Sequence, residues 1–133
     1  MSLPSGKPRA LIVDDEEVIA DTLAMILNRD GFEARAVYTC REAVALAPEF
    51  QPGILISDVL MSDINGIDAA IQIRAQVPEV QVFLLSGQSV AAELLSQSQA
   101  PSLGFEVLVK PVHPRDLLSK LHAAIAAAPE QVA

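Results

Sequence analysis

Four short polar clusters in the sequence each follow an apolar run and carry side chains suited to phosphoryl chemistry. They are Asp14-Asp15, Ser57-Asp58, Ser86-Gly87 and Lys110-Pro111. Carboxylates that lie close together repel one another unless a cation intervenes, and a few hard oxygen ligands suit Mg²⁺. A lysine ammonium and a serine hydroxyl can hold phosphoryl oxygens, and an aspartate can attack phosphorus to form an aspartyl phosphate. Brought together by a fold, these clusters would form a coherent phosphoryl-transfer site.

The elements that would position these clusters are apolar runs alternating with longer segments of helical spacing. The strands predicted from the runs are Arg9–Asp14, Phe32–Tyr38, Ile54–Asp58, Gln81–Ser86 and Glu106–Val109. The first, third and fourth runs are apolar at consecutive positions, which is typical of strands covered on both faces by helices. The second run alternates more, and this pattern suits a strand at the edge of a sheet.

A strand–helix unit repeated five times predicts an α/β fold with right-handed crossovers. We expect a single five-stranded parallel sheet in the order 2-1-3-4-5, a flavodoxin-like arrangement with helices on both faces. In such sheets ligands bind at the carboxyl ends of the strands. Because strands one, three, four and five lie side by side in this order, the four polar clusters would face one pocket.

Each cluster also has an interpretation that involves no chemistry. Acidic residues such as Asp14-Asp15 are favoured at helix starts, and Ser86-Gly87 alone is an ordinary turn. Asp58 could cap a loop, and Lys110-Pro111 could simply lead into a helix. Capping alone does not readily place all four clusters at the ends of neighbouring strands, so the joint pattern favours a functional site.

The composition bounds the class of protein. The chain has 133 residues, is 51% apolar and carries a net charge of -8, with 17 acidic and 9 basic residues. Nucleic-acid surfaces need clustered Lys and Arg, so we expect no direct nucleic-acid binding. A single cysteine, Cys40, excludes an internal disulfide. We also expect no membrane span and, without a secretory leader at the start, a cytoplasmic protein.

Nucleotide-binding loops and a calcium-binding loop are both excluded by the residues at specific positions. The sequence contains neither G-x-x-x-x-G-K nor G-x-G-x-x-G, the glycine patterns of the common nucleotide-binding loops. The stretch Asp63-Ile64-Asn65-Gly66 hints at a calcium loop. However, Met61 and Gln72 stand at its first and twelfth positions, where acidic ligands are needed.

Taken together, the motifs resemble the receiver domain of bacterial response regulators in two-component systems. The resemblance rests on Leu11-Ile12-Val13-Asp14-Asp15, Asp58-Val59-Leu60-Met61, Gly66, Leu85-Ser86-Gly87 and Val109-Lys110-Pro111. It implies a receiver domain over residues 9–127, preceded by an N-terminal extension at 1–8 and followed by a tail or truncated linker at 128–133. It also implies a phosphoacceptor signalling domain, not an enzyme in the usual sense, that assists its own phosphorylation and dephosphorylation.

The resemblance further assigns a role to each motif residue. Asp58 would accept the phosphoryl group of a phosphohistidine on a sensor histidine kinase or a histidine phosphotransfer protein. Mg²⁺ would be bound by Asp14, Asp15, Asp58 and the backbone carbonyl of Leu60. Ser86 and Lys110 would hold the phosphoryl oxygens. A homodimer through the face of the fourth helix, the fifth strand and the last helix is a further expectation.

The sequence departs from the family pattern in ways that bear on signalling. The family usually has Tyr or Phe three residues before the lysine, and here Val107 occupies that position. Phe105 shares the face of Val107 but lies about 7 Å away along the strand, so we do not expect it to substitute. Ser62 replaces a frequent proline, and the apolar Leu60 predicts slow loss of the phosphoryl group. Val107 keeps a second hypothesis open, a receiver-like interaction module that acts independently of phosphorylation.

Overall fold

The computed structural model describes residues 6–87, 90, 93 and 104–127, and in this part of the chain it confirms the predicted sheet. Five parallel strands lie in the order β2-β1-β3-β4-β5. Their bounds are β1 (Arg9–Val13), β2 (Glu33–Val37), β3 (Ile54–Asp58), β4 (Gln81–Ser86) and β5 (Glu106–Val109). The predicted strands agree with these within one residue at each end.

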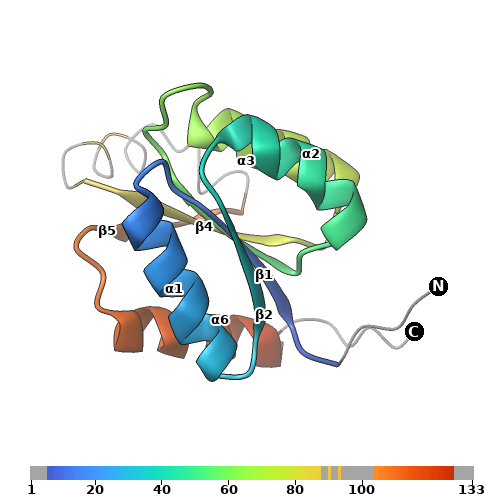
Figure 1. Ribbon diagram of the computed structural model, residues 1–133, viewed down its shortest axis with the longest axis vertical. Coiled ribbons are helices and arrows are strands. Elements are labelled where there is room, and N and C mark those ends of the chain that lie inside the picture. Colours follow the sequence, from blue (N-terminus) through green and yellow to red (C-terminus); the bar gives the residue numbers. More distant parts are fainter. Residues whose placement is uncertain (1–5, 88–89, 91–92, 94–103, 128–133) are drawn as a thin grey trace.

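Helices pack on both faces of this sheet, as the consecutive apolar runs indicated. The described helices are α1 (Glu17–Arg29), α2 (Cys40–Phe50), α3 (Gly66–Gln76) and α6 (Pro114–Ala127). Figure 1 shows α1 and α6 together on one face of the sheet and α2 and α3 together on the other. The predicted fourth helix, between β4 and β5, lies almost entirely outside the described residues, whereas the other two elements of the expected dimer face, β5 and α6, are described.

Strand β1 illustrates why the central strands carry no polar alternation. Leu11 and Val13 belong to the core cluster beneath α2 and α3, whereas Ala10 and Ile12 belong to the cluster beneath α1 and α6. All four side chains are at most 2% exposed. Successive side chains of a strand point to opposite faces, so a strand between two helical layers must be apolar at every position.

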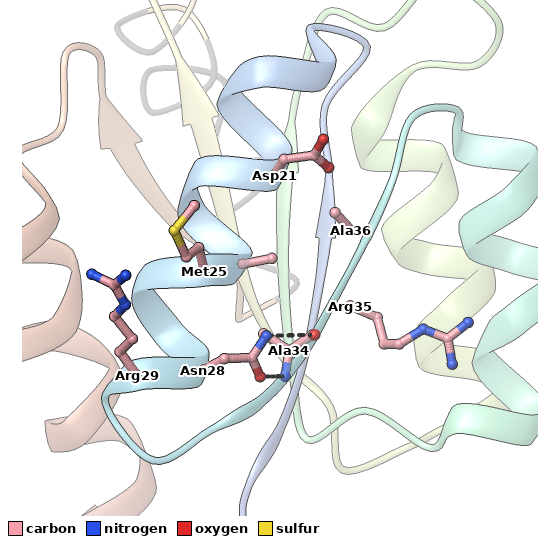
Figure 2. A pocket seen from close by; sticks show the side chains of 8 residues that line it. Asp21, Met25, Asn28, Arg29, Ala34, Arg35 and Ala36 are labelled. Carbon is pink, nitrogen blue, oxygen red and sulfur yellow. Dashed lines mark hydrogen bonds between the residues drawn. The ribbon is translucent and has the colours of Figure 1, made fainter.

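One of the two edge strands of the sheet, β2, is partly covered by a side chain of α1. The Asn28 carboxamide donates from Nδ2 to the Ala34 carbonyl oxygen (3.2 Å), and its Oδ1 accepts from the Ala34 N–H (2.8 Å). Figure 2 shows both bonds in the shallow hollow between α1 and β2. The amide thus occupies the hydrogen-bonding groups that an added strand would use.

In the part of the chain that the structure describes, no helix is both long and apolar enough to cross a lipid bilayer.

Candidate functional site

The four polar clusters meet at the carboxyl edge of the sheet because the register of the strands aligns their ends. Val13 pairs with Ser57, Asp58 with Leu85, and Ser86 with Val109. Beyond these pairs, the Lys110 N–H donates to the Ser86 carbonyl oxygen (2.8 Å). Residues separated by up to about a hundred positions in sequence are therefore brought into one site.

Three carboxylates form the acidic part of this site. Oxygen atoms of Asp14, Asp15 and Asp58 all lie within 4.8 Å of one another. Asp14 is buried, Asp58 is half-buried and Asp15 is exposed. Burial raises the pKa of Asp14, and the charges of Asp58 and Asp15 act in the same direction, against a hydrogen bond from the Glu16 N–H and the attraction of Lys110. A cluster of hard oxygen ligands with excess negative charge suits a divalent cation.

Lys110 supplies the balancing positive charge. Its Nζ lies 2.8 Å from Oδ2 of Asp58, and the two side chains are 37% and 12% exposed. Burial acts to lower the pKa of Lys110, but the hydrogen bond and charge of Asp58, helped by Asp14 and Glu16, outweigh burial and raise it. The ammonium group therefore stays charged beside the carboxylate that the sequence singles out as the nucleophile.

Ser86 and Leu60 flank Asp58 on neighbouring segments. Ser86 ends β4 and is buried, and its hydroxyl donates to the Gly87 carbonyl oxygen (3.3 Å). The Leu60 N–H donates to Oδ1 of Asp58 (3.4 Å), while the Leu60 side chain is 63% exposed. Both residues thus lie beside the end of β3, where the sequence analysis expected them.

Gly66 is part of the sequence motif for a steric reason that only the structure shows. Its N–H donates to the Val59 carbonyl oxygen (2.9 Å), which closes the loop between β3 and α3. A Cβ atom at this position would lie 2.1 Å from the Asp58 carbonyl oxygen. Only glycine allows the backbone of α3 to approach the phosphoacceptor candidate this closely.

An apolar groove opens next to the polar cluster. It has a volume of about 430 Å³ and runs between α1 and the segment that follows β5, with Asp14 and Lys110 at its border. Val18 and Ile19 line it and are 78% and 39% exposed. The opposite wall begins at the Lys110-Pro111 peptide bond, which is cis. Exposed apolar side chains beside charged groups form a surface on which a partner could dock.

Val107, which stands where an aromatic residue is usual in the resembled pattern, lies within β5. Val107 pairs with Leu84 in β4 and packs, half-buried, against the core cluster beneath α2 and α3. Phe105 is buried in the same cluster, with the guanidinium of Arg74 5.0 Å from its ring centroid. The aromatic ring is therefore enclosed at the start of β5, away from the polar edge of the sheet.

One residue of this region has a role that sequence reasoning missed. In the sequence Asp63 stands only in the stretch that hints at a calcium loop, but in the structure its carboxylate accepts hydrogen bonds from the backbone of Cys40 and Arg41 at the start of α2. No local pattern joins residues that are more than twenty positions apart, so the sequence alone carried no signal for this contact.

Comparison with known proteins agrees with this geometry. The family model of the response regulator receiver domain matches residues 10–122. The chemotaxis protein CheY of Thermotoga maritima is 31% identical over 115 residues, which cover 86% of this chain and 94% of that protein. Among solved structures, a CheY-like receiver domain protein from Methanospirillum hungatei superposes with a TM-score of 0.82 at 26% identity, covering 91% of this chain and 95% of that one.

Longer relatives match over only part of their length. The probable transcriptional regulatory protein TcrX of Mycobacterium tuberculosis is 26% identical over 126 residues, covering 94% of this chain but 53% of that protein. The DNA-binding response regulator MtrA of the same species is 23% identical over 119 residues, covering 90% of this chain and 51% of that protein. The chain thus spans about half the length of these two relatives.

Proposed function

Because this chain belongs to the response regulator receiver domain family of two-component systems, we propose that it accepts a phosphoryl group on Asp58 in a Mg²⁺-dependent reaction. The single observation that carries the proposal is the arrangement around Asp58. Its carboxylate lies within 4.8 Å of those of Asp14 and Asp15 and is bonded to the Lys110 ammonium at 2.8 Å. Three carboxylates able to hold a metal ion, one of them the candidate nucleophile, and a positive charge are therefore together at one edge of the sheet.

The donor set at this edge fits a magnesium ion. Asp14, Asp15, Asp58 and the backbone carbonyl of Leu60 would hold it, and each offers an oxygen atom, which is the ligand that Mg²⁺ prefers. The ion would offset negative charge on the phosphoryl oxygens and so allow an anionic phosphate to approach three carboxylates.

The transfer step follows from the roles that we propose for these side chains. An Asp58 oxygen forms the new O–P bond while the P–N bond of a phosphohistidine breaks, and the imidazole keeps the electron pair of the broken bond. Lys110, which pairs with Oδ2 of Asp58 before transfer, would then hold a phosphoryl oxygen. The Ser86 hydroxyl, at the end of the adjacent strand, would donate to another.

The phosphodonor we propose is a sensor histidine kinase or a histidine phosphotransfer protein. Support for a protein donor comes from the apolar groove bordered by Asp14 and Lys110. Val18 and Ile19 would be covered when a partner helix docks there, and their burial would stabilise the encounter. Phosphorylation would in turn change which partners the domain binds.

Acetyl phosphate with Mg²⁺ tests the phosphoacceptor role directly. We expect intact-mass spectrometry to detect one added phosphoryl group on the wild-type chain. The Asp58→Asn variant should take up none, because the amide is not a nucleophile toward phosphorus. Lys110→Ala keeps the nucleophile but lacks the charge that would hold the phosphoryl oxygen, so its phosphoryl uptake should be lower than that of wild type. Equal uptake by wild type and Asp58→Asn would contradict the proposal.

An interaction module that works without phosphate is the second candidate function. Val107 and the enclosed ring of Phe105 favour it, since neither provides an aromatic side chain at the polar edge of the sheet. Under this alternative, partner binding would be unchanged by beryllofluoride with Mg²⁺, which mimics the phosphorylated state. A change in partner affinity on adding beryllofluoride would favour the phosphoacceptor role instead.

A further inference from the structure

The loop between β3 and α3 is tied to the start of α2 by one carboxylate. Oδ1 of Asp63 accepts the Cys40 N–H (3.2 Å), and Oδ2 accepts the Arg41 N–H (3.0 Å). The Asp63 side chain is only 17% exposed. Each carboxylate oxygen thus has its own backbone donor, and the two bonds together fix the orientation of the side chain.

These two donors are the ones that the local sequence leaves unpaired at the start of α2. Thr39 caps the helix by accepting the Glu42 N–H (3.1 Å), and the Glu42 side chain accepts the Tyr38 N–H (3.1 Å). The first N–H groups of a helix have no partner within it, and a negative charge there is favourable. Asp63 therefore completes the cap of α2 from a distant part of the chain.

The charge state of Asp63 agrees with this role. Partial burial acts to raise its pKa, but hydrogen bonds from backbone N–H groups, led by those of Arg41 and Cys40, outweigh burial and lower it. The group is therefore ionised at neutral pH, with both oxygens available as acceptors.

The tethered loop is the segment that carries Leu60. The hydrogen bond between the Gly66 N–H and the Val59 carbonyl oxygen closes its base. Farther out, Asp63 and the contact of the Cys40 thiol with the Ile64 carbonyl oxygen (3.4 Å) attach the loop to α2. The backbone of Leu60 thus lies between a closed base and an anchored tip.

We infer that Asp63 is a positioning residue for the metal site, holding the β3–α3 loop against α2 so that the Leu60 backbone keeps its place beside Asp58. This inference rests on the proposed function, since it takes the Leu60 carbonyl to be a metal ligand. The hydrogen bonds of the Asp63 carboxylate link it to the start of α2 and not to the acidic cluster. Its effect reaches the metal through the loop backbone, as outer partners of metal ligands generally do.

Calorimetric titration of the full chain with Mg²⁺ tests this inference, with helix capping as the matched control. Asp63→Ala should weaken Mg²⁺ binding by about 10-fold, the lower end of the effect of losing an outer partner of a metal ligand. Asp63→Asn keeps the shape of the side chain but only one acceptor oxygen. Its Mg²⁺ affinity should therefore lie between those of wild type and Asp63→Ala. Thr39→Ala removes another cap of the same helix without touching the loop, so its Mg²⁺ affinity should equal that of wild type.

Each outcome decides the question. Unchanged Mg²⁺ affinity in Asp63→Asn, or an equal loss in Thr39→Ala, would overturn the inference, the second because helix stability alone would then explain the effect. Absence of Mg²⁺ binding by the wild type would overturn it as well. Wild type that binds Mg²⁺ but takes up no phosphoryl group would refute the proposed function, while the affinity ratio would still decide the role of Asp63.

Discussion

Replacing Gly66 by alanine adds one methyl group at the closest backbone approach to the candidate phosphoacceptor. The new Cβ would lie 2.1 Å from the Asp58 carbonyl oxygen and 3.0 Å from the Val59 Cα. A carbon–oxygen contact is normally about 3.3 Å or longer, so the backbones must separate by roughly 1.2 Å. Neither contact atom belongs to a flexible side chain, and therefore either the start of α3 or the end of β3 has to move.

The expected cost follows from comparable overpacking. Inserting a methyl group into a tightly packed site destabilises proteins by about 1–3 kcal/mol. Taking the middle of that range, about 2 kcal/mol, and subtracting up to about 1 kcal/mol for alanine's better helix propensity leaves a net loss of about 1–2 kcal/mol. For a chain of this size that corresponds to a fall in Tm of roughly 3–10 °C. Phosphoryl uptake should also fall, because the displaced carbonyl belongs to Asp58.

Thermal unfolding followed by circular dichroism measures the stability, and Gly53→Ala is the matched control. The nearest atom to an added Cβ at Gly53 is 3.9 Å away, and its φ is not positive. That substitution should leave stability unchanged or raise it by about 0.4–1 kcal/mol, because alanine restricts the unfolded chain. The steric reasoning would be refuted if Gly66→Ala proved as stable as Gly53→Ala.

Three further predictions concern single side chains. Tyr38 donates to Oδ1 of Asp21 (2.6 Å), and this bond, with partial desolvation and nearby acidic charge, raises the pKa of Tyr38 from 10.0 to about 12. The bond therefore stabilises the fold below pH 10, and its contribution is lost as the pH rises from 10 toward 12; ultraviolet titration of the single tyrosine should show the high midpoint, and Asp21→Asn should lower it. Asn28→Ala removes both hydrogen bonds to Ala34 and should cost about 1–3 kcal/mol in chemical denaturation, at about 0.5–1.5 kcal/mol for each bond; unchanged stability would contradict this role of Asn28. Burial, followed by nearby carboxylates, raises the pKa of the Cys40 thiol to about 12, so alkylation at neutral pH should be slow in the native chain and rapid after unfolding; fast native labelling would contradict the burial.

The sheet order could be predicted because its signals are local. Consecutive apolar residues in β1, β3 and β4 indicated strands covered on both faces, and five strand–helix units favoured one order. The structure confirms that order among the described residues. The convergence of Asp14, Asp58, Ser86 and Lys110 then follows from topology, since parallel neighbours present their carboxyl ends at one edge. Their individual roles in phosphoryl transfer stay predictions that the acetyl phosphate experiment tests.

The residue types at the strand ends can be read from the sequence alone, because each motif spans only a few positions along the chain. Tertiary structure decided the contacts that join distant segments: the bond of Lys110 to Asp58, the close approach of Gly66 to Asp58, and the tether from Asp63 to α2. It also decided that Asp14 is buried while its neighbour Asp15 is exposed. These features depend on distances of a few ångströms between segments far apart in sequence, and local patterns carry no such information.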